Sequence, residues 1–129
     1  MPRALNANFG IFGKIPTMNF KIEVQNNVLL VHVLAERLDT HSAPELKGIF
    51  TFEQKKGLNK MLLNLEKTKF CDSSGLSAIL VGNRLCKDTN GIFGITNIQP
   101  MVQKMIEIAQ LSSVLNIYST MDDALKGFE

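Results

Sequence analysis

The sequence of 129 residues has few of the residues on which metal sites and redox centres depend. It contains no tryptophan, two histidines and two cysteines, Cys71 and Cys86. The cysteines form no C-x-x-C pair and have no histidines at matching spacing, which argues against a zinc site and a redox motif. We therefore expect two free thiols, with Cys86 on the apolar side of a helix, and no metal or other cofactor.

The sequence also lacks a long apolar run and a charge of one dominant sign. Although 45% of the residues are hydrophobic, no uninterrupted apolar stretch approaches the roughly 20 residues that a membrane-spanning helix needs. Residues 1–17 lack the apolar core and cleavage site of a signal peptide, so a cytoplasmic location is the default expectation. The net charge is +2, and Lys55 and Lys56 are the only basic pair after residue 20. Direct nucleic-acid binding therefore has little support.

The length of the chain predicts one domain with one hydrophobic core. Residues 1–17 contain Pro2, Gly10, Gly13 and Pro16 ahead of the first periodic segment, which favours a flexible or loosely docked N-terminal leader. Apolar residues in this leader could also dock on the domain as an extra strand. We expect the folded domain to span residues 18–129.

Hydrophobic periodicity predicts an opening hairpin followed by alternating helices and strands. Strands are expected at 20–24, 28–34, 61–65, 92–95 and 115–118, with Asn26-Asn27 as the hairpin turn. Helices are expected at about 43–56, at about 73–89, from Pro100 onward, and from Thr120 through Leu125.

Several local signals define the helix ends and the buried positions. Capping boxes are expected at Ser42 with Glu45 and at Thr120 with Asp123, and helix ends at Gly57 and Asn90-Gly91. The third helix is expected to bury one face, formed by Met101, Val102, Met105, Ile106 and Ala109. Met101, Met105 and Met121 are interpreted as core residues, and His32 as a packed or edge histidine.

The order of these elements predicts an α/β fold. Strands that alternate with helices after a hairpin imply parallel pairing through right-handed crossovers, so only the first strand needs to be antiparallel. Functional sites in such sheets collect at the carboxyl ends of the strands, where the loops 35–42 and 66–75 should emerge. Asp39 and Ser73 are therefore expected to be neighbours in space.

The most informative segment is the turn Phe70-Cys71-Asp72-Ser73-Ser74-Gly75-Leu76, which lies between an apolar strand and an amphipathic helix. Unpaired N–H groups and the positive end of the helix dipole meet at such a helix N-terminus. A serine in this turn therefore sits where an added phosphate would find donors. The turn is a candidate switch or a candidate active site.

The motif Asp72-Ser73-Ser74-Gly75-Leu76 resembles that of STAS domains, the family of bacterial anti-sigma factor antagonists. Two further segments are similar to the same family: Leu38-Asp39 followed by Ser42-Ala43-Pro44-Glu45-Leu46, and the run from Met105 through Leu111 to Leu115. Together the three segments lie within residues 20–127. The resemblance implies a single-domain STAS-like fold with a mixed, mostly parallel β-sheet, an opening antiparallel hairpin and about four helices.

The resemblance implies that Ser73 is the phosphoacceptor. The alternative role for Ser73 is to cap the helix, and the two roles are compatible. Ser74 is then a second donor in the turn, or the modified residue in place of Ser73. The resemblance implies a partner-binding surface that contains Asp39, Asp72, Ser73, Ser74, Gly75 and Leu76.

The other residues of this surface also have structural alternatives. Asp39 could form an Asx-turn ahead of the helix, and Asp72 could be a helix cap without a partner role. Gly75 is expected to allow a close backbone approach, and Leu76 to enter the core. Glu36 and Arg37 depart from the glycine and glutamate that are usual in the family at these positions.

The resemblance implies an anti-sigma factor antagonist that is not an enzyme. Its unphosphorylated form would bind an anti-sigma factor serine kinase and free the sigma factor, phosphorylation of Ser73 would release it, and a serine phosphatase would reset it. One alternative is a STAS interaction subunit of a transporter or a stress-signalling complex. Another is a serine hydrolase, because Cys71-Asp72-Ser73-Ser74-Gly75 comes close to the G-x-S-x-G nucleophile elbow. The first glycine of that motif is missing and no histidine follows Ser73, which argues against hydrolysis.

Overall fold

A computed structural model describes residues 18–128, and the proposed leader at residues 1–17 lies outside this range. Seven strands are described: β1 (Phe20–Gln25), β2 (Val28–Val33), β3 (Arg37–Leu38), β4 (Lys60–Asn64), β5 (Phe70–Cys71), β6 (Ile92–Thr96) and β7 (Asn116–Tyr118). The described helices are α1 (Ala43–Lys55), α2 (Ser73–Asp88), α3 (Pro100–Ile108) and α4 (Met121–Gly127).

The five longer strands form one mixed sheet, in the order β1-β2-β4-β6-β7. β1 and β2 pair antiparallel, and each of the other neighbouring pairs is parallel. Asn26 and Asn27 both have positive φ angles, 54° and 66°, which a two-residue hairpin turn of type I′ requires. The predicted hairpin, the mostly parallel sheet and the α/β class are thus confirmed.

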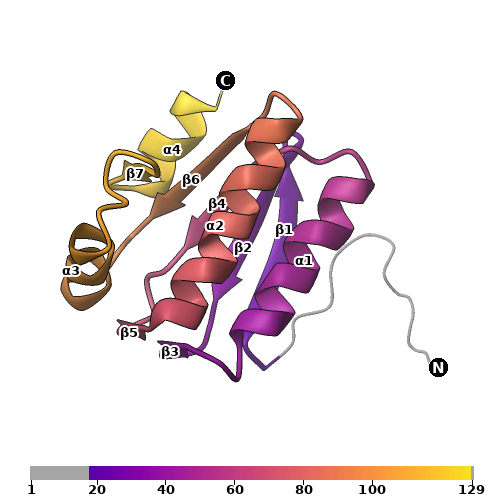
Figure 1. The fold of residues 1–129 in the computed structure, drawn as a ribbon. Coiled ribbons are helices and arrows are strands. Elements are labelled where there is room, and N and C mark those ends of the chain that lie inside the picture. The colour runs from indigo at the N-terminus through magenta and orange to yellow at the C-terminus, as the bar shows by residue number, and fades with distance from the viewer. Residues whose placement is uncertain (1–17, 129) are drawn as a thin grey trace.

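Helices cover both faces of the sheet, and each face has its own hydrophobic cluster (Figure 1). α1 and α2 pack side by side over one face, where the Phe50 and Phe93 rings meet edge to face at 5.5 Å. α4 packs on the other face, where Ala124 and Phe128 contact a cluster that includes Leu30 and Leu62. The larger cluster lies under α1 and α2. The N-terminus of α2, where Ser73 lies, is therefore held in place by a packed core.

The helix ends agree with the sequence signals except at the start of α1. Thr120 Oγ1 accepts a hydrogen bond from Asp123 N at 3.1 Å, which confirms the N-terminal cap of α4. Gly57 (φ +100°) and Asn90 (φ 60°) end α1 and α2 in the left-handed region, as predicted. The prediction of a capping box at Ser42 and Glu45 is wrong, because the Ser42 side chain makes no capping bond to α1. Its hydroxyl instead accepts a hydrogen bond from Asp39 N and donates one to Arg37 O.

The prediction for the apolar face of α3 was too broad. Val102 and Ile106 are buried, but Met101 is 53% exposed and Ala109 is also exposed. A helix of nine residues at the margin of the sheet presents one narrow stripe to the core, and successive residues turn by about 100° around it. Met101 is therefore not a core residue, and Met105 and Met121 are only half-buried.

Candidate functional site

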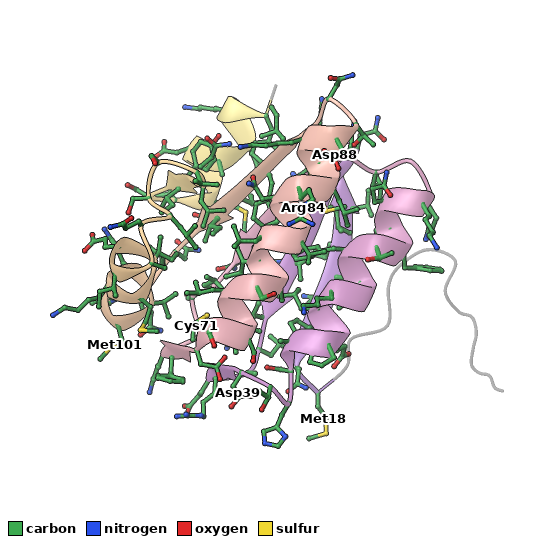
Figure 2. All side chains as sticks on the ribbon, in the orientation of Figure 1. Met18, Asp39, Cys71, Arg84, Asp88 and Met101 are labelled. Carbon is green, nitrogen blue, oxygen red and sulfur yellow. The ribbon has the colours of Figure 1, made fainter. Side chains whose placement is uncertain are left out.

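Two short strands that the sequence did not reveal bring the two candidate loops together. β3 and β5 pair in parallel, with Arg37 opposite Phe70 and Leu38 opposite Cys71. Asp72 N donates to Leu38 O at 3.2 Å, and Lys69 N donates to Glu36 O at 2.8 Å. Asp39 and Asp72 thus follow directly on two paired strands at the same end of the molecule, where Figure 2 labels Asp39 and Cys71. The expected proximity of the two loops is confirmed.

Asp72 is the N-terminal cap of α2. Its backbone is extended, and its carboxylate accepts a hydrogen bond from Gly75 N at 3.1 Å. Ser73 is the first residue of the helix and is exposed, whereas Ser74 is partly buried. The capping role considered for Ser73 is therefore filled by Asp72, and the Ser73 side chain lies at the surface of the first helical turn.

Replacing Asp72 with alanine is expected to lower the free energy of unfolding by about 1 kcal/mol, because a donor in the first turn of α2 loses its acceptor. Asp72→Asn should retain nearly all the stability, since asparagine is an equally good cap. Urea unfolding followed by circular dichroism would measure both values. Equal stability of Asp72→Ala and the parent protein would show that the cap contributes nothing.

Gly75 and Leu76 form the base of the site. A Cβ atom on Gly75 would collide with the Leu38 carbonyl oxygen and would lie 2.6 Å from Cys71 Sγ. The expected close backbone approach at Gly75 is thus confirmed, and it is the place where α2 rests on the β3–β5 pair. Leu76 is only 7% exposed and joins the larger hydrophobic cluster, as expected. Through these contacts both residues fix the first turn of α2 on the β3–β5 pair and on the core.

Asp39 lies in a turn stabilised by hydrogen bonds. Its carboxylate accepts from His41 N at 3.0 Å and from Arg37 Nε at 3.4 Å. The bond from the His41 backbone N–H is the main cause that lowers the pKa of Asp39; partial burial opposes it, and the hydrogen bond from Arg37 adds a smaller lowering. The Asx-turn considered for Asp39 is therefore present, and it holds an ionised carboxylate at the end of β3.

Arg37 and Phe70 are surface residues that sequence reasoning did not include in the site. The Arg37 guanidinium lies 4.2 Å from the centre of the Phe70 ring, and the Arg37 side chain is 62% exposed. This stacking follows from the β3–β5 register, which sets the two residues opposite each other. Arginine and aromatic residues are enriched at the energetic centres of protein interfaces. A signal was present in the sequence, since Arg37 departs from the usual family residue beside Asp39.

Neither Cys71, next to the turn, nor Cys86, near the C-terminal end of α2, is a good nucleophile. Both thiols are free and buried, and Cys86 lies on the apolar side of α2 as expected. Burial raises the pKa of Cys71 to about 12, with a smaller contribution from the Asp72 carboxylate. Burial likewise raises the pKa of Cys86 to about 12. Both sulfurs thus stay protonated near neutral pH and serve as packing atoms.

The remaining side chains offer no metal centre within the part of the chain that is described. Among residues 18–128, no three histidine, cysteine, aspartate or glutamate side chains are grouped closely enough to hold a metal ion. In the same range, every helix is too short or too polar to serve as a transmembrane span. The candidate site is a polar surface on paired loops, where the exposed Ser73 follows the Asp72 cap and Asp39 follows the paired strand β3.

The sequence model of the STAS domain family matches residues 19–124, nearly all of the part that folds as described. The chain belongs to the STAS domain family. The anti-sigma F factor antagonist of Paenibacillus polymyxa is 28% identical to this STAS protein over 115 residues, which are 87% of this chain and 97% of the relative. The anti-sigma factor antagonists of this family are regulators without enzymatic activity, in agreement with the expectation from the motif.

Solved structures share the fold of this STAS protein. A protein of Thermotoga maritima superposes with a TM-score of 0.78 at 22% identity, covering 84% of this chain and 93% of the other. The Bacillus cell fate determinant SpoIIAA in its phosphorylated form superposes with a TM-score of 0.68 at 20% identity, covering 85% and 99%. These similarities show that the arrangement of strands and helices is that of the STAS fold.

Proposed function

We propose that this STAS protein is an anti-sigma factor antagonist controlled by phosphorylation of Ser73. In the proposal, the unphosphorylated protein binds an anti-sigma factor kinase in the cytoplasm and thereby frees a sigma factor. The kinase then phosphorylates Ser73, which ends the complex, and a serine phosphatase restores the binding form. The observation that carries the proposal is the exposed Ser73 hydroxyl on the first turn of α2, next to the Asp72 cap.

The position of Ser73 is compatible with a phosphate in the free protein. Backbone N–H groups at a helix N-terminus are unpaired, and the helix dipole favours negative charge there. The modified chain should therefore stay folded, because a phosphate on Ser73 would lie at the start of the 16-residue helix α2. Release of a partner must consequently come from the interface itself.

The neighbouring charges supply a physical reason for release. Asp39 and Asp72 follow directly on the paired strands β3 and β5, so the surface around Ser73 already carries two carboxylates. A phosphate adds about −1.5 to −2 charges at neutral pH. A partner that covers this surface would have to remove water from the dianion, and the Arg37 guanidinium of the same surface is already bonded to Asp39. We therefore propose that phosphorylation expels the partner and leaves the fold intact.

The partner surface in this proposal extends beyond the residues of the motif. Arg37, stacked on Phe70 and bonded to Asp39, presents a planar cation beside Ser73's helix. Arg37, Phe70 and the Asp39 turn therefore lie next to one another on the surface, and the β3–β5 register determines their relative positions. A partner with an acidic side chain opposite Arg37 would fit it.

Incubation with the candidate kinase and ATP is expected to add one phosphate, and peptide mass spectrometry should locate it on Ser73. Ser73→Ala should abolish the mass gain. Ser77→Ala is a matched control, because Ser77 is an exposed serine one turn further along α2. A phosphate on Ser74, or a mass gain that persists in Ser73→Ala, would refute the assignment to Ser73.

A further inference from the structure

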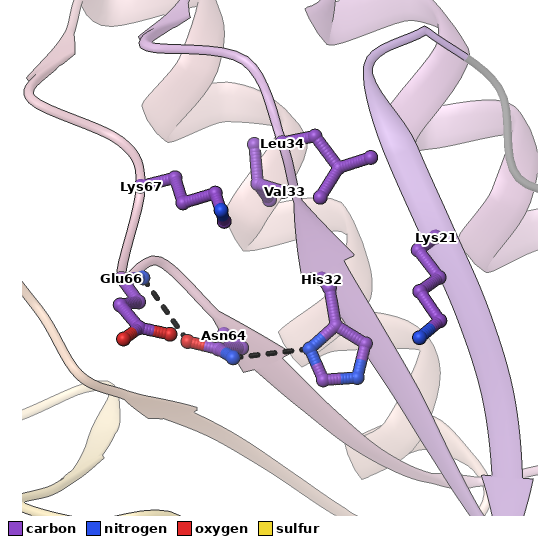
Figure 3. A pocket seen from close by; sticks show the side chains of 7 residues that line it. All are labelled: Lys21, His32, Val33, Leu34, Asn64, Glu66 and Lys67. Carbon is purple, nitrogen blue, oxygen red and sulfur yellow. Dashed lines mark hydrogen bonds between the residues drawn. The ribbon is translucent and has the colours of Figure 1, made fainter.

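A pocket of about 300 Å³ lies on the sheet at the carboxyl ends of β2 and β4 (Figure 3). Side chains alternate along a strand, so His32 and Asn64 share the face of Leu30 and Leu62, which is opposite to α1 and α2. Lys21, His32 and Asn64 lie in one register row across β1, β2 and β4. The lining residues are Lys21, His32, Val33, Leu34, Asn64, Glu66 and Lys67.

The floor of this pocket is a chain of hydrogen bonds. Asn64 Oδ1 accepts from Glu66 N at 3.0 Å and from Asn97 Nδ2 at 3.2 Å, which orients the amide. Asn64 Nδ2 therefore faces His32 Nδ1 at 3.0 Å and donates to it. His32 Nε2 then carries the hydrogen and donates to Glu23 Oε2 at 2.8 Å. The imidazole ring is therefore held at both nitrogens, and Figure 3 shows the bond on the Asn64 side.

The opening of the pocket carries unpaired positive charge. Lys21 and Lys67 lie on opposite sides of it (Figure 3), and within residues 18–128 neither lysine forms an ion pair. Glu66 is the one carboxylate among the lining residues, and the Glu23 carboxylate lies behind them, bonded to His32. Two ammonium groups that converge on one opening favour an anion between them.

The volume and the apolar lining indicate an organic molecule. At about 30 Å³ for each water, the pocket has room for roughly ten water molecules, more than a bare inorganic ion would fill. Leu34 supplies an apolar side chain beside the His32 ring, whereas the Val33 side chain is buried in the core on the other face of the sheet. We propose that this pocket binds a small organic anion, with its carboxylate or phosphate group held by Lys21 and Lys67 and its body against His32 and Leu34.

The two chain segments that frame the pocket also lead to the candidate partner surface. The chain runs from Leu34 to Asp39 on one side and from Asn64 to Ser73 on the other. Thr68 Oγ1 donates to Ala35 O at 3.0 Å, so the segments are bonded together immediately beyond the pocket. The bound anion would contact the first segment at Leu34 and the second at Asn64, on the sheet face opposite to α2. Its binding does not depend on the phosphorylation of Ser73 or on a kinase partner.

The test is a titration of the full chain with citrate and with 3-phosphoglycerate, followed by amide NMR and calorimetry. At about 10 mM, a concentration that reveals even millimolar affinity, at least one anion should saturably shift the amides of residues 32–34 and 64–67. Glycerol, which is uncharged, should shift none of them. Lack of response to both anions, or shifts confined to other parts of the molecule, would overturn the proposal.

Lysine variants test the assigned contacts. Lys21→Gln and Lys67→Gln should each weaken anion binding roughly fivefold, and the double variant more than about tenfold. Lys126→Gln on α4 is the control and should bind as the parent does. Since Lys21 and Lys67 are exposed, the variants should unfold at the same temperature as the parent protein. Unchanged anion affinity in the double variant would refute the proposed site.

Discussion

Ser73→Asp is expected to bind the proposed anti-sigma factor kinase more than about tenfold more weakly than the parent protein does. The added carboxylate would join Asp39 and Asp72 at the end of the β3–β5 pair, and a covering partner would have to desolvate all three. Ser73→Ala removes only a hydroxyl and should bind the kinase as well as the parent. Calorimetry or surface plasmon resonance would measure the three affinities.

Ser77→Asp separates a local effect from a general effect of charge. Ser77 is exposed on α2 but lies one turn away from the start of the helix, so its aspartate variant carries the same net charge in a different place. We expect kinase binding by Ser77→Asp to change much less than binding by Ser73→Asp. If Ser73→Asp binds as tightly as the parent, release by charge repulsion and desolvation is wrong. If both aspartate variants lose the same affinity, the effect does not depend on the Ser73 position.

Gly75→Ala is expected to lower the free energy of unfolding by about 1–3 kcal/mol, a large loss for one methyl group. The new Cβ would collide with the Leu38 carbonyl oxygen, which is backbone, and would lie 2.6 Å from the buried Cys71 Sγ. Relief would require α2 to move away from β3, which would weaken the bond from Asp72 N to Leu38 O. Denaturation by urea would measure the loss.

Gly48→Ala provides the matched control for this prediction. Gly48 lies inside α1, and a Cβ atom there would meet nothing within 4 Å. Because alanine is favoured over glycine in a helix, Gly48→Ala should raise stability by up to about 1 kcal/mol. If Gly75→Ala lowers the free energy of unfolding and Gly48→Ala raises it, the loss is due to the close contact at Gly75. A Gly75→Ala protein as stable as the parent would show that α2 can shift without penalty.

Local sequence signals were sufficient for much of the fold. The hairpin follows from period-two hydrophobicity around Asn26-Asn27, and both asparagines have the positive φ angles that the turn needs. The three longer helices and the parallel strands follow from periodicity and from their alternation along the chain. These elements depend on interactions within a few residues, or on a face that must be buried.

The predictions that failed depended on the path of a loop or on the packing of a helix, which residue spacing does not specify. Ser42 matches a capping box, but its hydroxyl bonds to Arg37 O and Asp39 N because the preceding turn brings them closer than the helix donors. Met101 has the spacing of a core residue, but α3 lies at the margin of the molecule, and the residue is exposed. Local spacing specifies which residues share a helix face, and only packing decides how wide a face is covered.

The sequence by itself determined the family motif, the order of elements and the position of Ser73 at a helix start. Only the tertiary structure decided that β3 and β5 pair, that Arg37 stacks on Phe70, and that Asp72 is the cap. Two-residue strands carry no periodic pattern, and the register between segments more than thirty residues apart depends on how the whole sheet is packed. The same reason applies to the pocket of Lys21, His32 and Asn64, whose members come from three strands that meet only in the folded sheet.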